Sequence, residues 1–118
     1  MRTRVTRSFR FEAAHQLPWH TGKCRDLHGH SYALEVTVEG QLNESGIVID
    51  FADLSALVRR EVIDRLDHTY LNDLIENPTA ELIAHDIWKR LEAVDLPLRR
   101  IRLWETADCY AEVSTDSG

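Results

Sequence analysis

The sequence lacks several features that would place a chain in a membrane or outside the cell. No stretch approaches the ~20 consecutive apolar residues of a membrane-spanning helix. The first residues, MRTRVTRSFRFEAAH, have neither the apolar segment nor the cleavage site of a secretory signal. Only two cysteines are present, Cys24 and Cys109, which is too few for a disulfide framework. We therefore expect a cytoplasmic protein with free thiols, although a single disulfide is compatible with the sequence.

Basic residues are also scarce. The 14 lysines and arginines are outnumbered by 20 aspartates and glutamates, which gives a net charge of −6 at pH 7. Because a nucleic-acid-binding surface usually needs a basic face, this balance argues against a nucleic-acid partner. An anionic ligand would need a local cluster of cations or a metal ion. With 118 residues and no repeat or linker, the chain predicts one globular domain over residues 1–118.

Two periodicities predict an α+β fold. Residues 3–14 and 31–40 alternate apolar and polar side chains, which is typical of strands with one buried face. Apolar residues at spacings of three and four predict a helix over 51–66, capped by Asp50, and another over 79–94, after the cap and proline signals of NPT. We also expect a short strand at 47–49, closing strands at 99–105 and 109–114, and a disordered tail after Val113. This order predicts an antiparallel sheet with two helices packed on one face.

Three histidines occupy matching strand positions. His15 continues the inward parity of the first strand, and His28 and His30 share the inward parity of the second if that strand begins early. Residues two apart on a strand point to the same side, so His-x-His is a natural half of a metal site. Imidazole suits zinc, and three histidines with one open position are typical of a catalytic zinc. The alternative is a turn with two surface histidines and one core histidine, because short motifs often occur by chance.

Cys24 lies four residues before this histidine pair and has charged neighbours. A free cysteine is most often a small buried residue. The flanking Lys23 and Arg25 do not suit a core position and favour a reactive thiolate. Cys24 is also suited to be the fourth ligand of a closed structural zinc site, and the sequence leaves both interpretations open. Cys109 has no such setting and is expected to be buried and inert.

Two further segments carry candidate acid–base groups. Asp67 and His68 follow the first predicted helix, where the acid can orient the histidine for proton transfer. The alternative for His68 is a favourable interaction with the helix dipole. Glu105 shares a strand face with Ile101 and Leu103. It is therefore either a buried carboxylate whose partner offers two adjacent N–H donors, or a solvated acid at a strand end.

Taken together, several segments resemble the 6-pyruvoyltetrahydropterin synthase family in sequence and in order. They span about residues 9–106 and read FEAAHQLP, CRDLHGHSY, GIVIDFADL, LDHTYLND, NPTAE and WET. Within that family, the spacing from Cys24 to His28 is similar to that of the bacterial 6-carboxytetrahydropterin synthases of queuosine biosynthesis. The pyruvoyl-forming enzymes have a longer gap at this point.

This resemblance implies a function and a site. The expected reaction converts 7,8-dihydroneopterin triphosphate to 6-carboxy-5,6,7,8-tetrahydropterin, acetaldehyde and triphosphate. A pyruvoyl-forming or side-chain-cleaving reaction on the same scaffold, or a non-catalytic zinc protein, is the alternative. The resemblance also implies the tunnelling fold (T-fold), commonly a homohexamer with active sites between subunits. The implied roles are zinc binding by His15, His28 and His30, proton abstraction by Cys24, proton relay by Asp67 and His68, pterin anchoring by Glu105 beside Thr106, and triphosphate contacts by Lys23 and Arg25.

Overall fold

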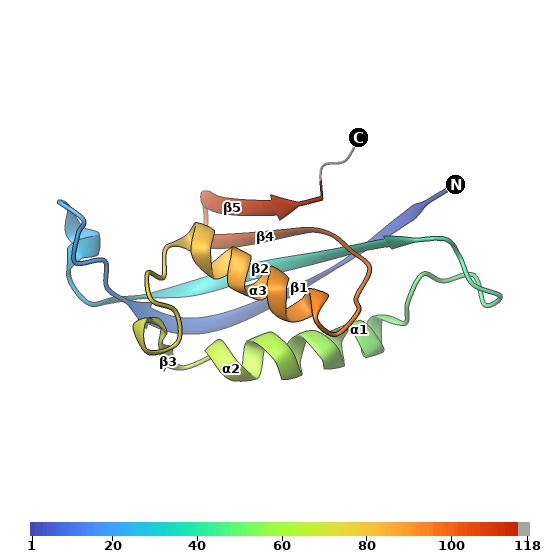
Figure 1. Ribbon diagram of the computed structural model, residues 1–118, viewed down its shortest axis with the longest axis horizontal. Helices are drawn as coiled ribbons and strands as arrows, with labels where there is room; N and C mark the ends of the chain where they lie inside the picture. The colour runs from blue at the N-terminus through green and yellow to red at the C-terminus, as the bar shows by residue number, and fades with distance from the viewer. Residues whose placement is uncertain (116–118) are drawn as a thin grey trace.

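The computed structural model describes residues 1–115, which form a five-stranded sheet with helices packed on one of its faces (Figure 1). Neighbouring strands are antiparallel, apart from the short parallel pair of β1 and β3. The predicted α+β class and antiparallel sheet are confirmed. In the spatial order β3-β1-β2-β4-β5, the strands are β3 (Thr69–Tyr70), β1 (Thr3–His15), β2 (His28–Gly40), β4 (Leu98–Thr106) and β5 (Cys109–Ser114).

The inward face of the sheet carries the core. Side chains alternate along β1 and β2 as the sequence predicts, and the register places Phe9 opposite Leu34 and Phe11 opposite Tyr32. The rings of Phe11 and Tyr32 stack with their centroids 5.0 Å apart. Burial of such apolar groups is the main favourable contribution to folding. None of the described helices covers the outer face of the sheet, which leaves one broad sheet surface open (Figure 1).

The first helical segment runs without interruption from residue 51 to residue 66, as predicted, but it is not α-helical throughout. It consists of α1 (Phe51–Val58), a π-helical turn (Arg59–Ile63) and a last α-helical turn, α2 (Asp64–Leu66). Its buried residues Leu54, Val58, Val62 and Leu66 are each four apart. On an ideal α-helix each such step rotates about 40° too far to keep one face. The wider π turn lets this stripe stay on the core. The predicted cap is confirmed, since Asp50 Oδ1 accepts from the Ala52 N–H at 2.7 Å.

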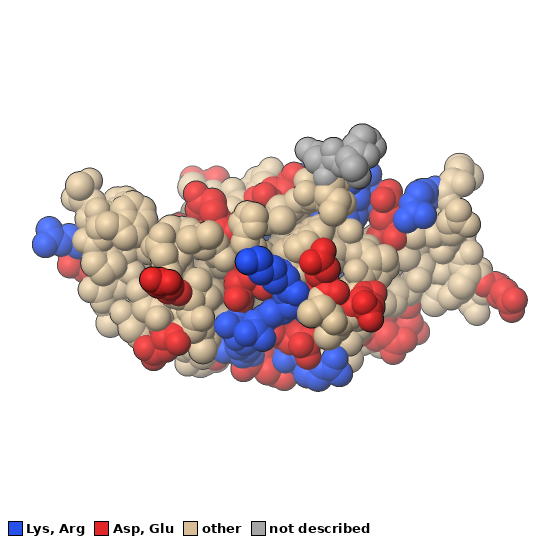
Figure 2. Space-filling model, viewed as in Figure 1, with Lys and Arg blue, Asp and Glu red and all other residues tan. Residues whose placement is uncertain are grey.

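The second helix, α3 (Ala80–Glu92), lies across the sheet beside α1 and α2 (Figure 1). Thr79 caps it by accepting the Leu82 N–H at 3.1 Å. An ion pair of 2.6 Å between Arg65 and Asp86 links α2 to α3. Acidic and basic side chains are intermixed over this helical face (Figure 2). The buried stripe of α3 consists of Ile83, Ala84, Ile87 and Leu91.

Two elements differ from the predictions. The strand expected at 47–49 is absent from the described residues, because the backbone there is satisfied locally around Asn43. The Asn43 N–H donates to the Ile47 carbonyl at 2.9 Å, and the Asn43 side-chain oxygen accepts from Ser45 at 2.8 Å. Conversely, the strand β3 is present in the structure but was not predicted from the sequence. It has only two residues, too few for alternation to reveal, and it pairs with Ala13 and Ala14 of β1.

Predictions for the end of the chain are also corrected. Of the tail that was expected to be disordered, Ser114 belongs to β5 and the Thr115 N–H donates to the Arg99 carbonyl at 3.2 Å. Residues 116–118 of that tail lie outside the described residues. Cys109 is exposed rather than buried, because it adjoins the turn between β4 and β5. Across residues 1–115, the helices are too short or too polar to span a bilayer.

Candidate metal centre and active site

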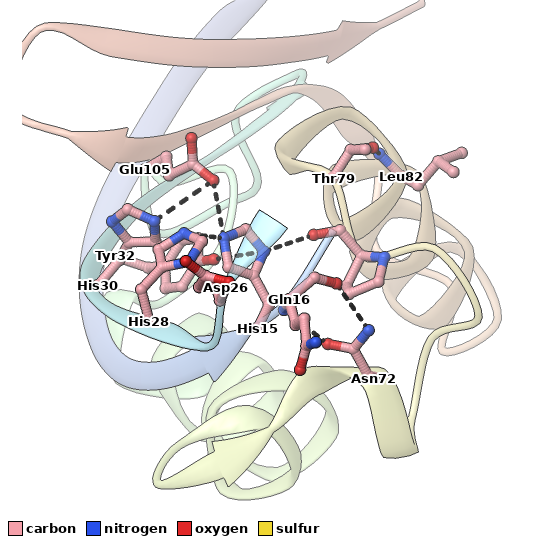
Figure 3. Close-up of polar contacts among 11 residues, drawn as sticks. His15, Gln16, Asp26, His28, His30, Tyr32, Asn72, Thr79, Leu82 and Glu105 are labelled. Carbon is pink, nitrogen blue, oxygen red and sulfur yellow. Dashed lines mark hydrogen bonds and ion pairs between the residues drawn. The ribbon is translucent and has the colours of Figure 1, made fainter. Parts of the chain in front are cut away.

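The pairing of β1 with β2 brings three histidines to one end of the sheet. The register places His15 directly opposite His28, and His30 opposite Ala13. On one face of an antiparallel pair, opposite and diagonal side chains are neighbours. The three imidazoles therefore converge, and their candidate ligand atoms lie within 4.8 Å of one another (Figure 3). His15 is fully buried, whereas His28 and His30 are half-buried.

Two of the rings are oriented by backbone carbonyl groups. His15 Nδ1 lies 2.8 Å from the Pro78 oxygen, and His28 Nδ1 lies 2.7 Å from the Asp26 oxygen. Because a carbonyl oxygen only accepts, both Nδ1 atoms carry the proton in the neutral rings. The two Nε2 atoms are then lone-pair acceptors, yet they lie 2.9 Å apart. Two lone pairs at that distance repel unless a cation or a proton lies between them.

His30 is the third imidazole of the group, and its surroundings also favour a bound cation. Its Nε2 atom is buried and has no hydrogen-bond partner among the described residues. Burial lowers the pKa of His30 most, and the neighbouring His15 and His28 lower it further, against an opposing effect of Glu105. The ring is therefore neutral at neutral pH, which is the form that binds a metal. A buried, unpaired Nε2 beside two others fits a divalent metal ion, and imidazole donors suit zinc among several transition metals.

Glu105 reaches the same point from β4. Its Oε1 lies 3.3 Å from His15 Nε2 and 3.6 Å from His30 Nε2 (Figure 3). The register between β4 and β5 shifts between Trp104 and Thr106, so Glu105 occupies a β-bulge, a feature that often re-aims a side chain beside a site. Its side chain is only 25% exposed and contacts two of the histidines, so it is not a solvated acid at a strand end.

Two clefts meet at His30. Gly29, His30 and Ser31 line both of them. The larger, of about 890 Å³, extends over the outer face of the sheet and includes Glu105 and Thr106 in its wall. The smaller, of about 590 Å³, extends toward β3 and has His68 in its wall. The predicted pterin anchor and the predicted proton relay therefore line two different clefts, which share His30.

Asp67 and His68 lie at the edge of the sheet beside β1. Asp67 Oδ2 is 3.0 Å from His68 Nδ1, and Asp67 Oδ1 accepts the Glu12 N–H at 2.8 Å. The hydrogen bond from Glu12 is the largest of the effects that lower the pKa of Asp67. His68 has a positive φ of 58°, and its N–H donates to the Glu12 carbonyl. These contacts hold the pair at the strand edge with the imidazole 78% exposed.

Cys24 lies in the loop between β1 and β2, on a short 3₁₀ turn (Lys23–Arg25). The thiol is half-buried, and the Leu17 N–H donates to the Cys24 carbonyl at 2.9 Å. Within residues 1–115, the group of converging ligand atoms contains the three histidines and not Cys24, so one chain does not form the closed four-ligand site. Lys23 and Arg25 are exposed, and neither lines the two clefts.

Three residues near His15 were not singled out from the sequence as parts of the site. Tyr32 is fully buried with its hydroxyl 3.5 Å from His15 Nδ1, and burial raises its pKa far above the usual range. Asn72 makes two hydrogen bonds to the backbone of Gln16, the residue after His15. Its Oδ1 accepts the Gln16 N–H at 2.9 Å, and its Nδ2 donates to the Gln16 carbonyl at 2.8 Å (Figure 3). The third is Pro78, through its carbonyl. Tyr32 lies on the same face of its strand as His28 and His30, so the sequence could have identified it as a neighbour of the site. Asn72 and Pro78 are far from His15 in the sequence, and no local pattern points to them.

The fold and the site define a class of protein, a small α+β protein with a three-histidine candidate metal centre at one end of its sheet. The chain belongs to the 6-pyruvoyl tetrahydropterin synthase family, whose model matches residues 4–116. It is 44% identical over 115 residues to the 6-carboxy-5,6,7,8-tetrahydropterin synthase of Synechocystis sp., which covers 91% of this chain and 89% of that protein.

Two other similarities extend this comparison. A dihydroneopterin monophosphate aldolase of Pyrococcus furiosus is 39% identical over 108 residues, or 89% of this chain and 91% of its own length. The structure of Caenorhabditis elegans 6-pyruvoyl tetrahydropterin synthase superimposes with a TM-score of 0.88 at 26% identity, covering 98% of this chain and 97% of that one. The T-fold expected from the sequence is confirmed, and the similar proteins with named activities act on pterins.

Proposed function

We propose that this protein is a zinc-dependent 6-carboxy-5,6,7,8-tetrahydropterin synthase of queuosine biosynthesis that acts on 7,8-dihydroneopterin triphosphate. The observation that carries the proposal is the convergence of three imidazoles, two with Nδ1 committed to carbonyls, beside a carboxylate in an open cleft. This arrangement provides metal ligands, a ligand anchor and access in one place. The 44% identity to a protein of that name supports the choice of reaction.

His15, His28 and His30 would hold the zinc through their Nε2 atoms. When bound there, zinc supplies Lewis-acid chemistry, which polarises the side-chain hydroxyl groups of the substrate and makes the adjacent C–H bond more acidic. The lowered pKa of His30 keeps its imidazole neutral and ready to bind, and burial of His15 fixes the position of the second ligand. A zinc ion held by these three imidazoles would keep a fourth position for the substrate, as a catalytic site requires.

Glu105 is assigned to the pterin ring. An ionised carboxylate accepts two parallel hydrogen bonds from adjacent N–H donors, which the amidine-like edge of a pterin offers. Glu105 and Thr106 line the wall of the larger cleft, so the ring would lie there while its side chain points toward the histidines. Neutralisation of the Glu105 charge by ligand or metal would also relieve its contact with the lone pairs of His15 and His30.

Cys24, Asp67 and His68 are assigned to proton transfer. The Cys24 thiolate would remove the proton from the activated carbon, and His68, oriented by Asp67, would move protons at the side-chain oxygens. His68 and His30 line the same cleft, which supports a proton relay from His68 to a substrate lying beside the three histidines. Elimination of triphosphate, addition of one water molecule and cleavage of a carbon–carbon bond would follow, which together yield the carboxylate and acetaldehyde. Lys23 and Arg25 are exposed cations beside Cys24 and remain candidates for contact with triphosphate.

The proposal includes a homohexamer with sites between subunits, in the cytoplasm. Within the described residues β1 pairs with β3 only at Ala13 and Ala14, so most of its outer edge is free to pair with another chain. The opposite edge is β5, and the outer sheet face is open. The exposed position of His68 and the loop position of Cys24 suit residues completed by a neighbouring subunit.

A second candidate is cleavage of the dihydroneopterin side chain, which the similarity to the Pyrococcus furiosus aldolase favours. Mass spectrometry of the products after incubation of the zinc-loaded protein with 7,8-dihydroneopterin triphosphate separates the possibilities. A 6-carboxytetrahydropterin product supports the proposal. A 6-pyruvoyl product or an aldolase product would keep the site and replace the reaction, and no turnover by zinc-bound protein would favour a non-catalytic zinc protein.

A further inference from the structure

The turn formed by Asn77, Pro78 and Thr79 contacts two parts of the proposed site that have different roles, the metal ligand His15 and the loop that carries Cys24. These residues open the NPTAE segment, which the chemistry proposed above does not use. The Pro78 carbonyl accepts a hydrogen bond from His15 Nδ1 at 2.8 Å. The Asn77 side-chain oxygen accepts the Trp19 Nε1–H at 2.9 Å, and Trp19 belongs to the loop that carries Cys24. One turn therefore touches the metal ligand and the thiol loop.

The turn is held firmly by its own contacts. Pro78 is buried, and its ring fixes φ. The Thr79 N–H donates to the Asn77 carbonyl at 2.8 Å, while the Thr79 hydroxyl oxygen caps α3 by accepting the Leu82 N–H at 3.1 Å (Figure 3). Because α3 is anchored by a buried stripe, the direction of the Pro78 carbonyl is set by the core of the protein.

We propose that the 77–79 turn is a positioning device that sets the direction of His15 Nε2 and holds the Cys24 loop at the same reference point. This inference rests on the proposed function, since it concerns a divalent metal at the three histidines. The carbonyl fixes the tautomer and the ring orientation of the buried ligand, as outer hydrogen-bond partners of metal-binding histidines generally do. Residues 77–79 act through other groups and do not contact the reacting atoms.

The connection to Cys24 runs through hydrogen bonds inside the loop. The His20 N–H donates to the Leu17 carbonyl at 2.9 Å, and the Leu17 N–H donates to the Cys24 carbonyl at 2.9 Å. Leu17 is buried, whereas Trp19 is 61% exposed. The exposed indole is held by its N–H bond to Asn77 and by the neighbouring His20 ring, whose centroid lies 5.7 Å away. Loss of that bond is expected to loosen the loop without disturbing the core.

The metal half of the proposal is tested by zinc affinity, measured by competition with a chromogenic chelator. Thr79→Ala removes the cap that holds the turn and leaves the Pro78 carbonyl less firmly directed, so zinc binding should weaken severalfold, up to the roughly 10–100-fold that follows direct loss of an outer hydrogen-bond partner. Thr79→Ser keeps the capping hydroxyl and should bind zinc as the wild type does. Equal zinc affinity in the wild type and Thr79→Ala would overturn the proposal. A wild-type protein that binds no zinc would overturn the proposed function together with this inference.

The loop half is tested by alkylation of the zinc-loaded protein with iodoacetamide, followed by peptide mapping. Trp19→Phe removes the indole N–H, together with part of the aromatic ring, at an exposed position, so the fold is retained even if Thr79→Ala proves unstable. Because the loop is loosened, the alkylation rate of Cys24 should rise severalfold. Cys109, which is exposed and outside the loop, provides an internal reference with an unchanged rate. The zinc affinity of Trp19→Phe should stay at the wild-type value. Unchanged reactivity of Cys24 in this variant would overturn the part of the proposal that concerns the loop.

Discussion

Removal of the bound metal is expected to weaken the fold without unfolding it. The core is a continuous cluster of apolar residues between the sheet and the helices, and the three histidines lie at one end of it. Of the three, only His15 is fully buried. Each large apolar side chain in the cluster contributes about 1.5–3 kcal/mol by burial, so the folded state does not depend on the metal for its core. Small zinc domains that unfold without metal lack such a core.

The size of the effect follows from binding linkage. A metal that binds only the folded state adds about 4 kcal/mol when its free concentration is about 1,000 times the Kd. For a domain of this length, each 1 kcal/mol moves the melting temperature by about 3–6 °C, so chelation should lower Tm by roughly 12–24 °C. Without metal, the facing lone pairs of His15 and His28, 2.9 Å apart, add repulsion that contributes in the same direction.

The assay compares zinc-loaded and EDTA-treated protein by circular dichroism and thermal unfolding at the same protein concentration. At 25 °C the far-ultraviolet spectrum should be unchanged, and only Tm should fall. His28→Gln serves as a control, since its Tm should not respond to EDTA and should lie between those of zinc-loaded and chelated wild type, because the repulsion between His15 and His28 is also removed. Loss of secondary structure on chelation at 25 °C would refute the reasoning and indicate a structural zinc site. A Tm insensitive to chelation would show that the histidines bind no metal.

Other variants test single contacts. Glu105→Gln should raise the KM for the pterin substrate by about tenfold or more, since one charged hydrogen bond is lost; a fall in zinc affinity instead would make Glu105 a metal ligand. Because the Glu12 N–H lowers the pKa of Asp67 below its ordinary 3.8, this carboxylate stabilises the folded state above that pH, and the contribution is lost as the pH falls through the lower folded-state pKa. Asp67→Asn should therefore flatten the acid limb of stability measured by urea unfolding, and an unchanged limb would exclude this cause. Leu103→Ala should cost about 2–5 kcal/mol in urea unfolding because Leu103 is fully buried, whereas Cys109→Ser should cost almost nothing.

Most of the sheet could be predicted because alternation has a fixed period. The inward parity of Phe9 and Phe11 extends to His15, and that of Tyr32 extends back to His28, so the convergence of the histidines follows from the sequence once β1 and β2 pair. The T-fold follows from the resemblance of several ordered segments rather than from periodicity. Alternation and resemblance together are sufficient to identify the candidate ligands and the fold.

The remaining features depend on tertiary contacts that leave no local pattern. The acceptors of His15 and the clamp on Gln16 come from residues more than fifty positions away, Pro78 and Asn72. The π turn keeps buried residues that are spaced four apart in contact with the core, which depends on the sheet that they pack against. The strand β3 is too short to show any periodicity. The position of Cys24 relative to the histidines is set by a loop, whose path follows from its hydrogen bonds and not from its composition.

The most direct test of the account is to measure zinc content and product formation together in the wild type and in Cys24→Ala. The account predicts that both proteins bind zinc through the three histidines, and that only the wild type converts 7,8-dihydroneopterin triphosphate. Product formation by zinc-bound Cys24→Ala at the wild-type rate would contradict the assigned role of the thiol. Loss of zinc from Cys24→Ala would contradict the open three-histidine site, because it would make Cys24 a ligand.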